Sequence, residues 1–345
     1  LGVLLAGPEP AARAGGQRRV LHRTAPGLSR PGTAAVARLA AVEETRRVAV
    51  VIHPTRPEAV TAAVQFIDGM RRHTIECVVE ANHVDQVREQ LPDAYISPLA
   101  VGSRVELIVV FGGDGSMLRA SEWALPRGIP LLGVNLGHVG FLAELEASEI
   151  RELIEKVAAR DYTIERRLTL GAHVFDTDGT TLWNSFAVNE VSTEKASRRR
   201  MADLMVSIDG RPLSRWACDG VLVASASGST AYGFSAGGPV IWPNTEAFEV
   251  VPIAAHALFS QACVVAPSSQ VELQLMGGDL GADAVVWCDG RRSVDLQSGC
   301  SIVIERYPQD LQIARLSEQP FTTRLVKKFG LDVEGWRAPR HNLRV

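Results

Sequence analysis

The sequence predicts two domains, an α/β domain with a Rossmann-like parallel sheet and then a β-rich, sandwich-like domain. Three observations support this fold class. The chain has 345 residues, enough for about two domains. Between residues 47 and 160, continuous apolar runs alternate with helical patterns. Beyond residue 161, short runs rich in β-forming residues follow one another, and turn signals separate them.

Alternating strands and helices predict the first domain. Val48–Ile52 is a continuous apolar run that ends at His53-Pro54, as a buried strand does. Pro57 suits the first turn of a helix, where its missing N–H is not needed. Further strands are expected at 75–80, 107–111 and 129–134, and helices at 57–70, 85–91, 116–125 and 148–160. Strands that alternate with helices form a parallel sheet covered on both faces.

Short strands predict the second domain. They are expected at 168–175, 182–188, 201–208, 221–224, 271–275, 284–288 and 301–305. The turn signals are Asp178-Gly179, Asp209-Gly210, Asp289-Gly290 and Ser298-Gly299. Such a series is typical of an antiparallel sandwich.

One helix is predicted within the second domain, from about Thr230 to Ala236. Ser229 is placed to cap its start, and Gly237-Gly238 to end it. The sequence Cys-Asp-Gly occurs at 218–220 and at 288–290. We interpret this echo as shared hairpin composition and not as a repeat.

The beginning of the chain has a different composition. Residues 1–40 contain many Arg, Ala, Gly and Pro, and Glu9 is their only acid. A transit peptide has this composition, but we favour a disordered tail or an overextended start. The expected division is therefore a leader at 1–45, an α/β domain at 46–161, a β-rich domain at 162–318, and a final segment at 319–345 that packs back on the first domain.

Composition excludes several classes of protein. A net charge of −3, without a dense basic stripe, argues against nucleic-acid binding. The five cysteines form no C-x-x-C pair, which argues against a disulfide framework and a structural zinc site. No apolar run approaches the ~20 residues of a transmembrane helix. We expect a soluble, cytoplasmic protein that binds no membrane.

The first chemical motif is Gly112-Gly113-Asp114-Gly115-Ser116. It follows a buried strand and opens a helix, where ligands bind in open α/β sheets. Glycines allow backbone N–H groups to approach phosphate oxygens, and Asp114 would reach a substrate hydroxyl or help to hold Mg²⁺. The alternative is a tight turn with a helix-capping Asp. The motif is not a Walker A loop, which requires G-K-[ST].

Two further motifs follow in the second domain. Asn189-Glu190 ends a predicted strand, and an amide beside a carboxylate can read a ribose diol or a base edge. The stretch from Asp219-Gly220 to Gly228-Ser229-Thr230-Ala231-Tyr232 leads from a strand into a glycine turn and a helix start. Tyr232 offers a flat face for a base. Read singly, each of these residues could be an exposed strand end, a helix cap or a core residue.

Taken together, the motifs resemble the NAD kinase family, whose pattern is G-G-D-G-[TS], then N-E, then D-G and G-S-T-A-Y-x-x-S-A-G-G-P. The stretch Asn135-Leu-Gly137-His-Val-Gly140-Phe-Leu142 is similar to the family's N-x-G-x-x-G-F-L loop, and the segments 252–259 and 321–336 are similar as well. The resemblance covers about residues 47 to 338. It is closest to the actinobacterial branch.

The resemblance implies the two-domain NAD kinase architecture and the transfer of a phosphoryl group from ATP or polyphosphate to the 2′-hydroxyl of the adenosine ribose of NAD, giving NADP. It implies Asp114 as the general base. It also implies Mg²⁺, held through the phosphates and by Asp114, and a homo-oligomer, dimer or tetramer. The implied phosphate loop is Gly112, Gly113, Gly115 and Ser116. The implied NAD-binding residues are Asn189, Glu190, Asp219, Gly228, Ser229, Thr230, Ala231, Tyr232 and Ser235.

One stretch departs from the family pattern. Where the family commonly has S-T-P-T-G, this chain has Ala224-Ser225-Ala226-Ser227-Gly228. Losing the proline leaves the loop more flexible before folding, and losing the first hydroxyl removes one hydrogen-bonding group. We expect an effect on affinity more than on the type of reaction.

Two alternative functions remain open. A non-catalytic NAD(P)-binding sensor would keep the pocket without the reaction. Another G-G-D-G kinase, acting on a lipid or a sugar, would keep the phosphate loop but has no need of Asn189-Glu190 followed by the tyrosine motif. A Rossmann dehydrogenase is disfavoured, because no G-x-G-x-x-G follows the first strand.

Overall fold

The computed structural model describes residues 45–100, 102–136, 140–143, 145–146, 149–277, 283–317 and 320–333. The predicted leader lies outside these residues except for Thr45, and so does the end of the 321–336 segment. Among the described residues, no helix is both long and apolar enough to span a bilayer.

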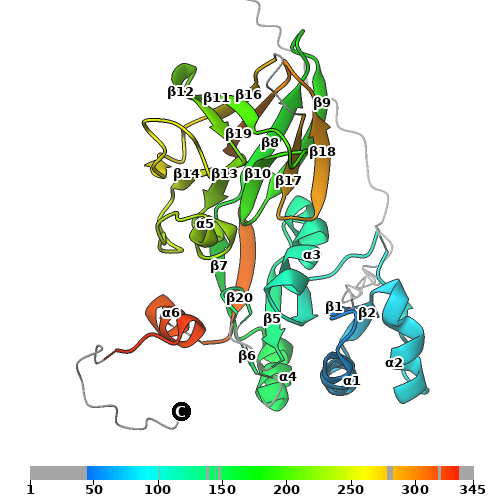
Figure 1. Ribbon diagram of the computed structural model, residues 1–345. Coiled ribbons are helices and arrows are strands. Elements are labelled where there is room, and N and C mark those ends of the chain that lie inside the picture. Colours follow the sequence, from blue (N-terminus) through cyan, green and yellow to red (C-terminus); the bar gives the residue numbers. More distant parts are fainter. Residues whose placement is uncertain are drawn as a thin grey trace, which may run out of the picture. The chain divides into compact units, whose positions relative to one another are not determined.

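The first sheet has eight strands in the order β3-β2-β1-β4-β5-β20-β7, and β6 pairs with β5. Figure 1 shows β20, in orange, between β7 and β5. Only the β20–β7 pair is antiparallel. The strands are β1 (Arg47–Ile52), β2 (Glu76–Val79), β3 (Ser97–Pro98), β4 (Leu107–Phe111), β5 (Leu131–Asn135), β6 (Leu145–Glu146), β7 (Thr163–Arg167) and β20 (Leu311–Arg315). The predicted parallel sheet is confirmed.

Helices cover both faces of this sheet. Along β1, Val48, Val50 and Ile52 pack with α1, α2 and α4, whereas Ala49 and Val51 pack with α3 on the other face. The helix α1 begins at Pro57, as predicted. The helices are α1 (Pro57–Arg72), α2 (Val84–Gln90), α3 (Asp114–Ala124) and α4 (Ile150–Ala159), with short 3₁₀ turns η1 (Ala81–His83) and η2 (Leu125–Arg127).

Two antiparallel sheets of six strands form the β-rich part, in the orders β15-β14-β13-β10-β17-β18 and β12-β11-β16-β19-β8-β9. Residues of both sheets share one buried core, which confirms the predicted sandwich. The strands are β8 (Leu170–Phe175), β9 (Thr181–Ala187), β10 (Glu190–Lys195), β11 (Ala202–Ile208), β12 (Arg211–Cys218), β13 (Gly220–Ser225), β14 (Phe248–Ile253), β15 (Cys263–Val265), β16 (Val271–Leu275), β17 (Ala284–Cys288), β18 (Arg292–Leu296) and β19 (Ser301–Arg306).

Several strands have no counterpart among the predicted ones. They include β7, β12 and β18, whose exposed positions include charged residues such as Arg166, Arg211 and Asp295. The strand β20 follows the whole sandwich in sequence but lies between β5 and β7 in the first sheet. Its partners, β5 and β7, are distant in the sequence, so no local sequence pattern predicts that β20 pairs with them. The predicted division into four segments stays a prediction.

The predicted helix at 230–236 is wrong in detail. A 3₁₀ turn, η4 (Gly228–Thr230), comes first, and α5 covers only Tyr232–Ser235. The N-cap of α5 is Ala231, so Ser229 does not cap it. The predicted end is confirmed, because Gly237 has a φ of 91° just beyond the helix.

The last described helix, α6 (Phe321–Phe329), packs on two parts of the molecule. The rings of Phe321 and Phe329 lie 5.6 and 6.1 Å from that of Phe141, which lies in the loop after β5. Phe329 also lies 4.6 Å from Phe234 of α5. These ring contacts join α6 both to the loop after β5 and to the glycine-rich segment of the sandwich.

Candidate functional site

A basic cavity lies over the glycine loop between β4 and α3. The strand ends at Phe111, Gly113 is the N-cap of α3, and Asp114 is its first residue. The cavity has a volume of about 390 Å³. Its lining residues are His53, Pro54, Arg56, Gly113, Gly115, Ser116, Arg119 and Arg291. Three guanidinium groups and a helix start make it suitable for phosphate oxygens.

Burial lowers the pKa of His53 at the edge of this cavity, and the positive charges of Arg56 and Arg119 lower it further. The imidazole is therefore neutral at neutral pH. An arriving polyanion would offset the two positive charges and favour protonation of His53.

Two backbone N–H groups hold the Asp114 carboxylate. Oδ2 accepts from the N–H of Phe141 at 3.1 Å, and Oδ1 accepts from the N–H of Leu142 at 3.0 Å. A Cβ on Gly140 would lie 2.5 Å from Oδ1, so only glycine lets the segment approach this closely. Each carboxylate oxygen can accept a second hydrogen bond. Asp114 is thus fixed at the start of α3, with capacity for a substrate hydroxyl.

Asn189 and Glu190 lie at the junction of β9 and β10, beside α3. Phe186 and Val188 pack in the same core as Met117 of α3. The N–H groups of Val188 and Asn189 donate to the buried carboxylate of Asp289, at 3.0 and 2.7 Å. Asp289 therefore fixes the backbone that presents the Asn189 and Glu190 side chains.

The carboxyl group of Glu190 is almost fully buried. Burial raises its pKa to about 8, with a further contribution from Asp289. The backbone N–H of Tyr232 donates to it, while Oε2 has no hydrogen-bond partner among the described residues. A largely protonated carboxyl can both donate and accept at neutral pH, which suits a ribose hydroxyl.

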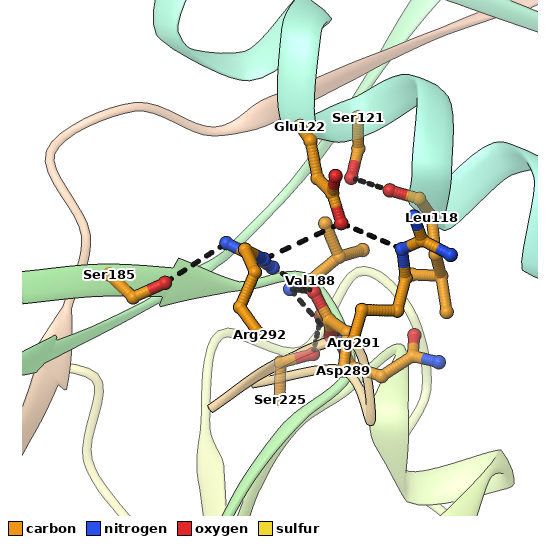
Figure 2. A network of polar contacts seen from close by, with 10 residues as sticks. Leu118, Ser121, Glu122, Ser185, Val188, Ser225, Asp289, Arg291 and Arg292 are labelled. Atoms are coloured by element: carbon orange, nitrogen blue, oxygen red, sulfur yellow. Dashed lines mark hydrogen bonds and ion pairs between the residues drawn. The ribbon is translucent and has the colours of Figure 1, made fainter. Parts of the chain in front are cut away.

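A polar network ties α3 to the hairpin of β17 and β18 (Figure 2). Glu122 of α3 accepts from Arg291 Nε at 2.7 Å and lies 3.5 Å from Arg292 Nε. Arg292 also donates to Asp289 at 2.9 Å and to Ser185 at 3.1 Å. The helix that begins with Asp114 is thereby connected, through Asp289, to the backbone of Asn189.

A buried hydroxyl, that of Ser225, holds the segment 224–228, which departs from the family's sequence pattern. Ser225 Oγ donates to the carbonyl of Val188 at 2.6 Å and accepts from the N–H groups of Ser227 and Gly228 at 3.1 and 3.3 Å. A Cβ on Gly228 would lie 2.1 Å from the carbonyl oxygen of Asn189. The Asn-Glu motif and the glycine-serine segment are thus in direct contact.

The remaining predicted residues take different positions. Ser229 is fully buried, and its hydroxyl donates to the carbonyl of Ala226 and accepts from the N–H of Ile241, so it holds the loop together. Thr230 donates to Ser227 at 3.2 Å. Ala231 is partly buried at the start of α5, and Ser235 is exposed at its end.

Tyr232 and Asp219 lie within electrostatic range of each other. Tyr232 is 37% exposed, and burial raises its pKa, followed by the charges of Glu194, Glu190 and Asp219. Asp219 forms an ion pair with Lys195 of β10. The structure therefore groups Asn189, Glu190, Gly228, Tyr232 and Asp219 on neighbouring elements.

A buried acid, Glu249 of β14, lies behind α5. It is fully buried, and neither carboxylate oxygen has a hydrogen-bond partner among the described residues. A Cβ on Gly233 of α5 would lie 2.1 Å from Oε1. Burial raises the pKa of Glu249 to about 7. In the order of the sheet, Glu190, Ala224 and Glu249 face one another across β10, β13 and β14.

Replacing Glu249 by leucine is expected to stabilise the protein at pH 8 by on the order of 3 kcal/mol more than at pH 5. The unfolded carboxyl has a pKa of 4.5, whereas the folded one has a pKa of about 7. Its contribution to stability is fully present below the lower value and is lost as pH rises through the higher one. Urea unfolding of parent and variant at both pH values measures the difference. A stability difference that does not vary with pH would contradict this assignment.

Sequence reasoning missed several residues that organise the site. In the sequence, Asp289 stands out only as part of an Asp-Gly turn. Ser225 stands in the segment that departs from the family pattern, and nothing near it in the sequence shows the partners of its hydroxyl. Glu249, Arg292 and Arg324 stand alone in the sequence, and their partners are remote. The Asp-Gly signal at 289–290 and the family-like segment 321–336, which contains Arg324, are the signals that could have pointed to this group.

Comparison with known proteins identifies the family. The ATP-NAD kinase N-terminal domain model matches residues 48–162, and the ATP-NAD kinase C-terminal domain model matches residues 188–316. A protein named NAD kinase from Cutibacterium acnes is 51% identical over 302 residues, which cover 87% of this chain and 95% of that relative. The curated relatives are mostly actinobacterial, as the resemblance predicts.

Solved structures agree with this fold. Yeast NADH kinase complexed with NADH is similar with a TM-score of 0.76 and 22% identity, covering 85% of this chain and 90% of that chain. An NAD kinase from Archaeoglobus fulgidus in complex with ATP has a TM-score of 0.63 and 26% identity, covering 83% of this chain and 100% of that chain.

Proposed function

The chain belongs to the NAD kinase family and phosphorylates NAD, and we propose that Asp114 is the general base that takes the proton from the 2′-hydroxyl of the adenosine ribose. One observation carries this proposal. Two backbone N–H groups fix the Asp114 carboxylate at the N-terminus of α3. The basic cavity lies directly beside it, because Gly113 and Gly115, the residues on either side of Asp114, line that cavity. A nucleophile and a phosphoryl group would meet there.

We infer that the basic cavity takes the phosphates of ATP. The Archaeoglobus relative is described in complex with ATP. Arg56, Arg119 and Arg291 line the cavity together with the glycine loop. Polyphosphate is the alternative donor, because its repeating phosphates would engage the same groups. Gly112, Gly113, Gly115 and Ser116 form the phosphate loop in this proposal.

The NAD site in this proposal is formed by the residues grouped around Asn189. Asn189 and Glu190 hold the adenosine part, and Tyr232 provides a face for a ring. Asp219, Thr230, Ala231 and Ser235 hold the rest of the dinucleotide. Gly228 and Ser229 shape the loop, since Gly228 touches Asn189 and the Ser229 hydroxyl is used within the loop.

A divalent metal fits this arrangement through the phosphates. The described residues contain no group of three or more His, Cys, Asp or Glu side chains placed to hold a metal. Mg²⁺ usually takes one or two carboxylates and completes its shell with phosphates and water. Asp114 is the carboxylate at the phosphate loop that would serve, and the ion would neutralise phosphate charge during transfer.

A homo-oligomer in the cytoplasm completes the proposal. Leu258, Phe259 and Val264 are large apolar residues exposed at or near β15, the edge strand of its sheet. Exposed apolar groups beside an edge strand suit contact with a second subunit. All five cysteines are free thiols, which suits a reducing compartment.

The direct test is NADP formation by the purified chain with NAD, Mg²⁺ and either ATP or polyphosphate. NADP formed with ATP supports the proposed donor, and a higher rate with polyphosphate would replace it. Folded protein that binds NAD but forms no NADP with any donor would support the sensor alternative. Phosphorylation of a lipid or a sugar in place of NAD would support the other kinase.

Replacing Arg56 by methionine is expected to raise KM for ATP about 10- to 100-fold, since one charge-assisted hydrogen bond contributes about 1.5–3 kcal/mol. KM for NAD should change little, because Arg56 lines the donor cavity. Steady-state kinetics with each substrate varied in turn measure both constants. Arg72→Met, at the exposed end of α1, is the matched control. Equal effects of the two variants would contradict the assignment of the cavity.

A further inference from the structure

The peptide group between Phe141 and Leu142 makes two hydrogen bonds. Its carbonyl oxygen accepts from Arg324 Nη1 at 3.1 Å, and its N–H donates to Asp114 Oδ1 at 3.0 Å. A guanidinium on the carbonyl polarises the peptide and strengthens its N–H as a donor, because linked hydrogen bonds reinforce one another. The positive charge of Arg324 therefore acts on the Asp114 carboxylate through a single peptide group.

The surroundings of Arg324 fix its position. It is 5% exposed on α6, whose Phe321 and Phe329 rings pack on the ring of Phe141. Arg315 of β20 donates to the next carbonyl, that of Leu142, at 3.1 Å. Arg315 is itself paired with Glu165 at 2.7 Å. Two buried guanidinium groups thus hold two successive carbonyls. The one held by Arg324 shares its peptide plane with the Leu142 N–H, and so Arg324 sets the direction of that N–H toward Asp114.

We propose that Arg324 is a positioning residue for phosphoryl transfer, which holds the Asp114 carboxylate in its working orientation through the Phe141–Leu142 peptide. This inference rests on the proposed role of Asp114 as the base. Arginine suits the task because it stays charged at every accessible pH and donates from a rigid, planar group. The contact spans 183 residues of sequence, from α6 to the loop after β5.

The test is a double-mutant cycle between Arg324→Met and Asp114→Asn, read as kcat and as KM for NAD. In the parent, Arg324→Met is expected to lower kcat about 10- to 100-fold, the usual effect of a charge-assisted hydrogen bond. KM for NAD should change less than about threefold, since NAD binding is assigned elsewhere. In the Asp114→Asn background, Arg324→Met should lower the residual kcat less than about twofold. Arg324→Lys, which keeps a charged donor, should recover at least half of the loss on a logarithmic scale.

Each outcome separates the two proposals. If Asp114→Asn retains full turnover, Asp114 is not the base, and the positioning role of Arg324 fails with that assignment. If Asp114→Asn lowers turnover as expected but Arg324→Met lowers kcat by the same factor in both backgrounds, Arg324 is structural and only its positioning role is overturned. Lys328→Met, an exposed charge on the same helix, is the matched control and should leave kcat unchanged. If Arg324→Met does not fold, the cycle is run with Arg324→Gln. Additive effects of Arg324→Gln and Asp114→Asn on kcat would then overturn the positioning role of Arg324.

Discussion

Replacing Asp114 by asparagine is expected to lower kcat by about 100- to 10,000-fold, the usual contribution of a positioned general base. The amide cannot take a proton from the ribose hydroxyl. In the parent, the backbone N–H groups of Phe141 and Leu142 each donate to one carboxylate oxygen. In the variant, the amide NH₂ group would face one of these donors and could not accept its hydrogen bond. The dissociation constant for NAD should change only a few-fold, because the NAD-binding residues lie on other elements.

Stopped-flow or steady-state formation of NADP gives kcat for this variant, and calorimetry gives the affinity for NAD. Asp114→Glu, which retains a carboxylate, serves as the comparison, and its turnover should lie between those of the parent and the amide. Unchanged turnover in Asp114→Asn would contradict the role of the base. Loss of NAD binding in step with turnover would mean that Asp114 binds substrate and does not activate it.

The second large effect is expected at Asp289. Its carboxylate is fully buried and accepts from two backbone N–H groups and from Arg292. Asp289→Ala would leave those three donors without their acceptor, which costs about 3–5 kcal/mol for a broken buried ion pair. We expect the free energy of unfolding to fall by that amount. NAD affinity should fall at least 10-fold, because the Asn189 backbone is released.

Urea unfolding and NAD titration measure the two effects of Asp289→Ala. Asp295→Ala, an exposed change on the same hairpin, is the control and should alter stability by less than about 0.5 kcal/mol. A similar, small loss for both variants would show that Asp289 is only a turn residue, as its sequence context first indicates.

Local sequence patterns predicted the parts of the fold that depend on neighbours in the chain. The apolar run at 48–52, Pro57 at a helix start and the Asp-Gly turns all appear where expected. The same is true of the glycine loop, because a strand and a helix that flank glycines fix its place in a parallel sheet.

Long-range partners explain what the sequence did not reveal. The sequence predicts a turn at Asp289 and assigns no role to Arg324, yet both are buried because their partners come from segments far away in the chain. β7 ends with three successive charged residues, and the last of them, Arg167, is buried beside Glu165. Charge alone is a weak guide to exposure when a pairing strand, here β20, is remote.

The position of β20 between β5 and β7 has a consequence for biosynthesis. A ribosome releases β1 to β5 first and then the entire sandwich, and only afterwards the strand that completes the first sheet. Until then the edge of β5 that β20 will occupy offers unpaired backbone groups to other chains. The two halves therefore cannot mature one after the other, and a cut near residue 161 would remove two strands from the first sheet. Folding of this enzyme should become cooperative only once its last strand has been made.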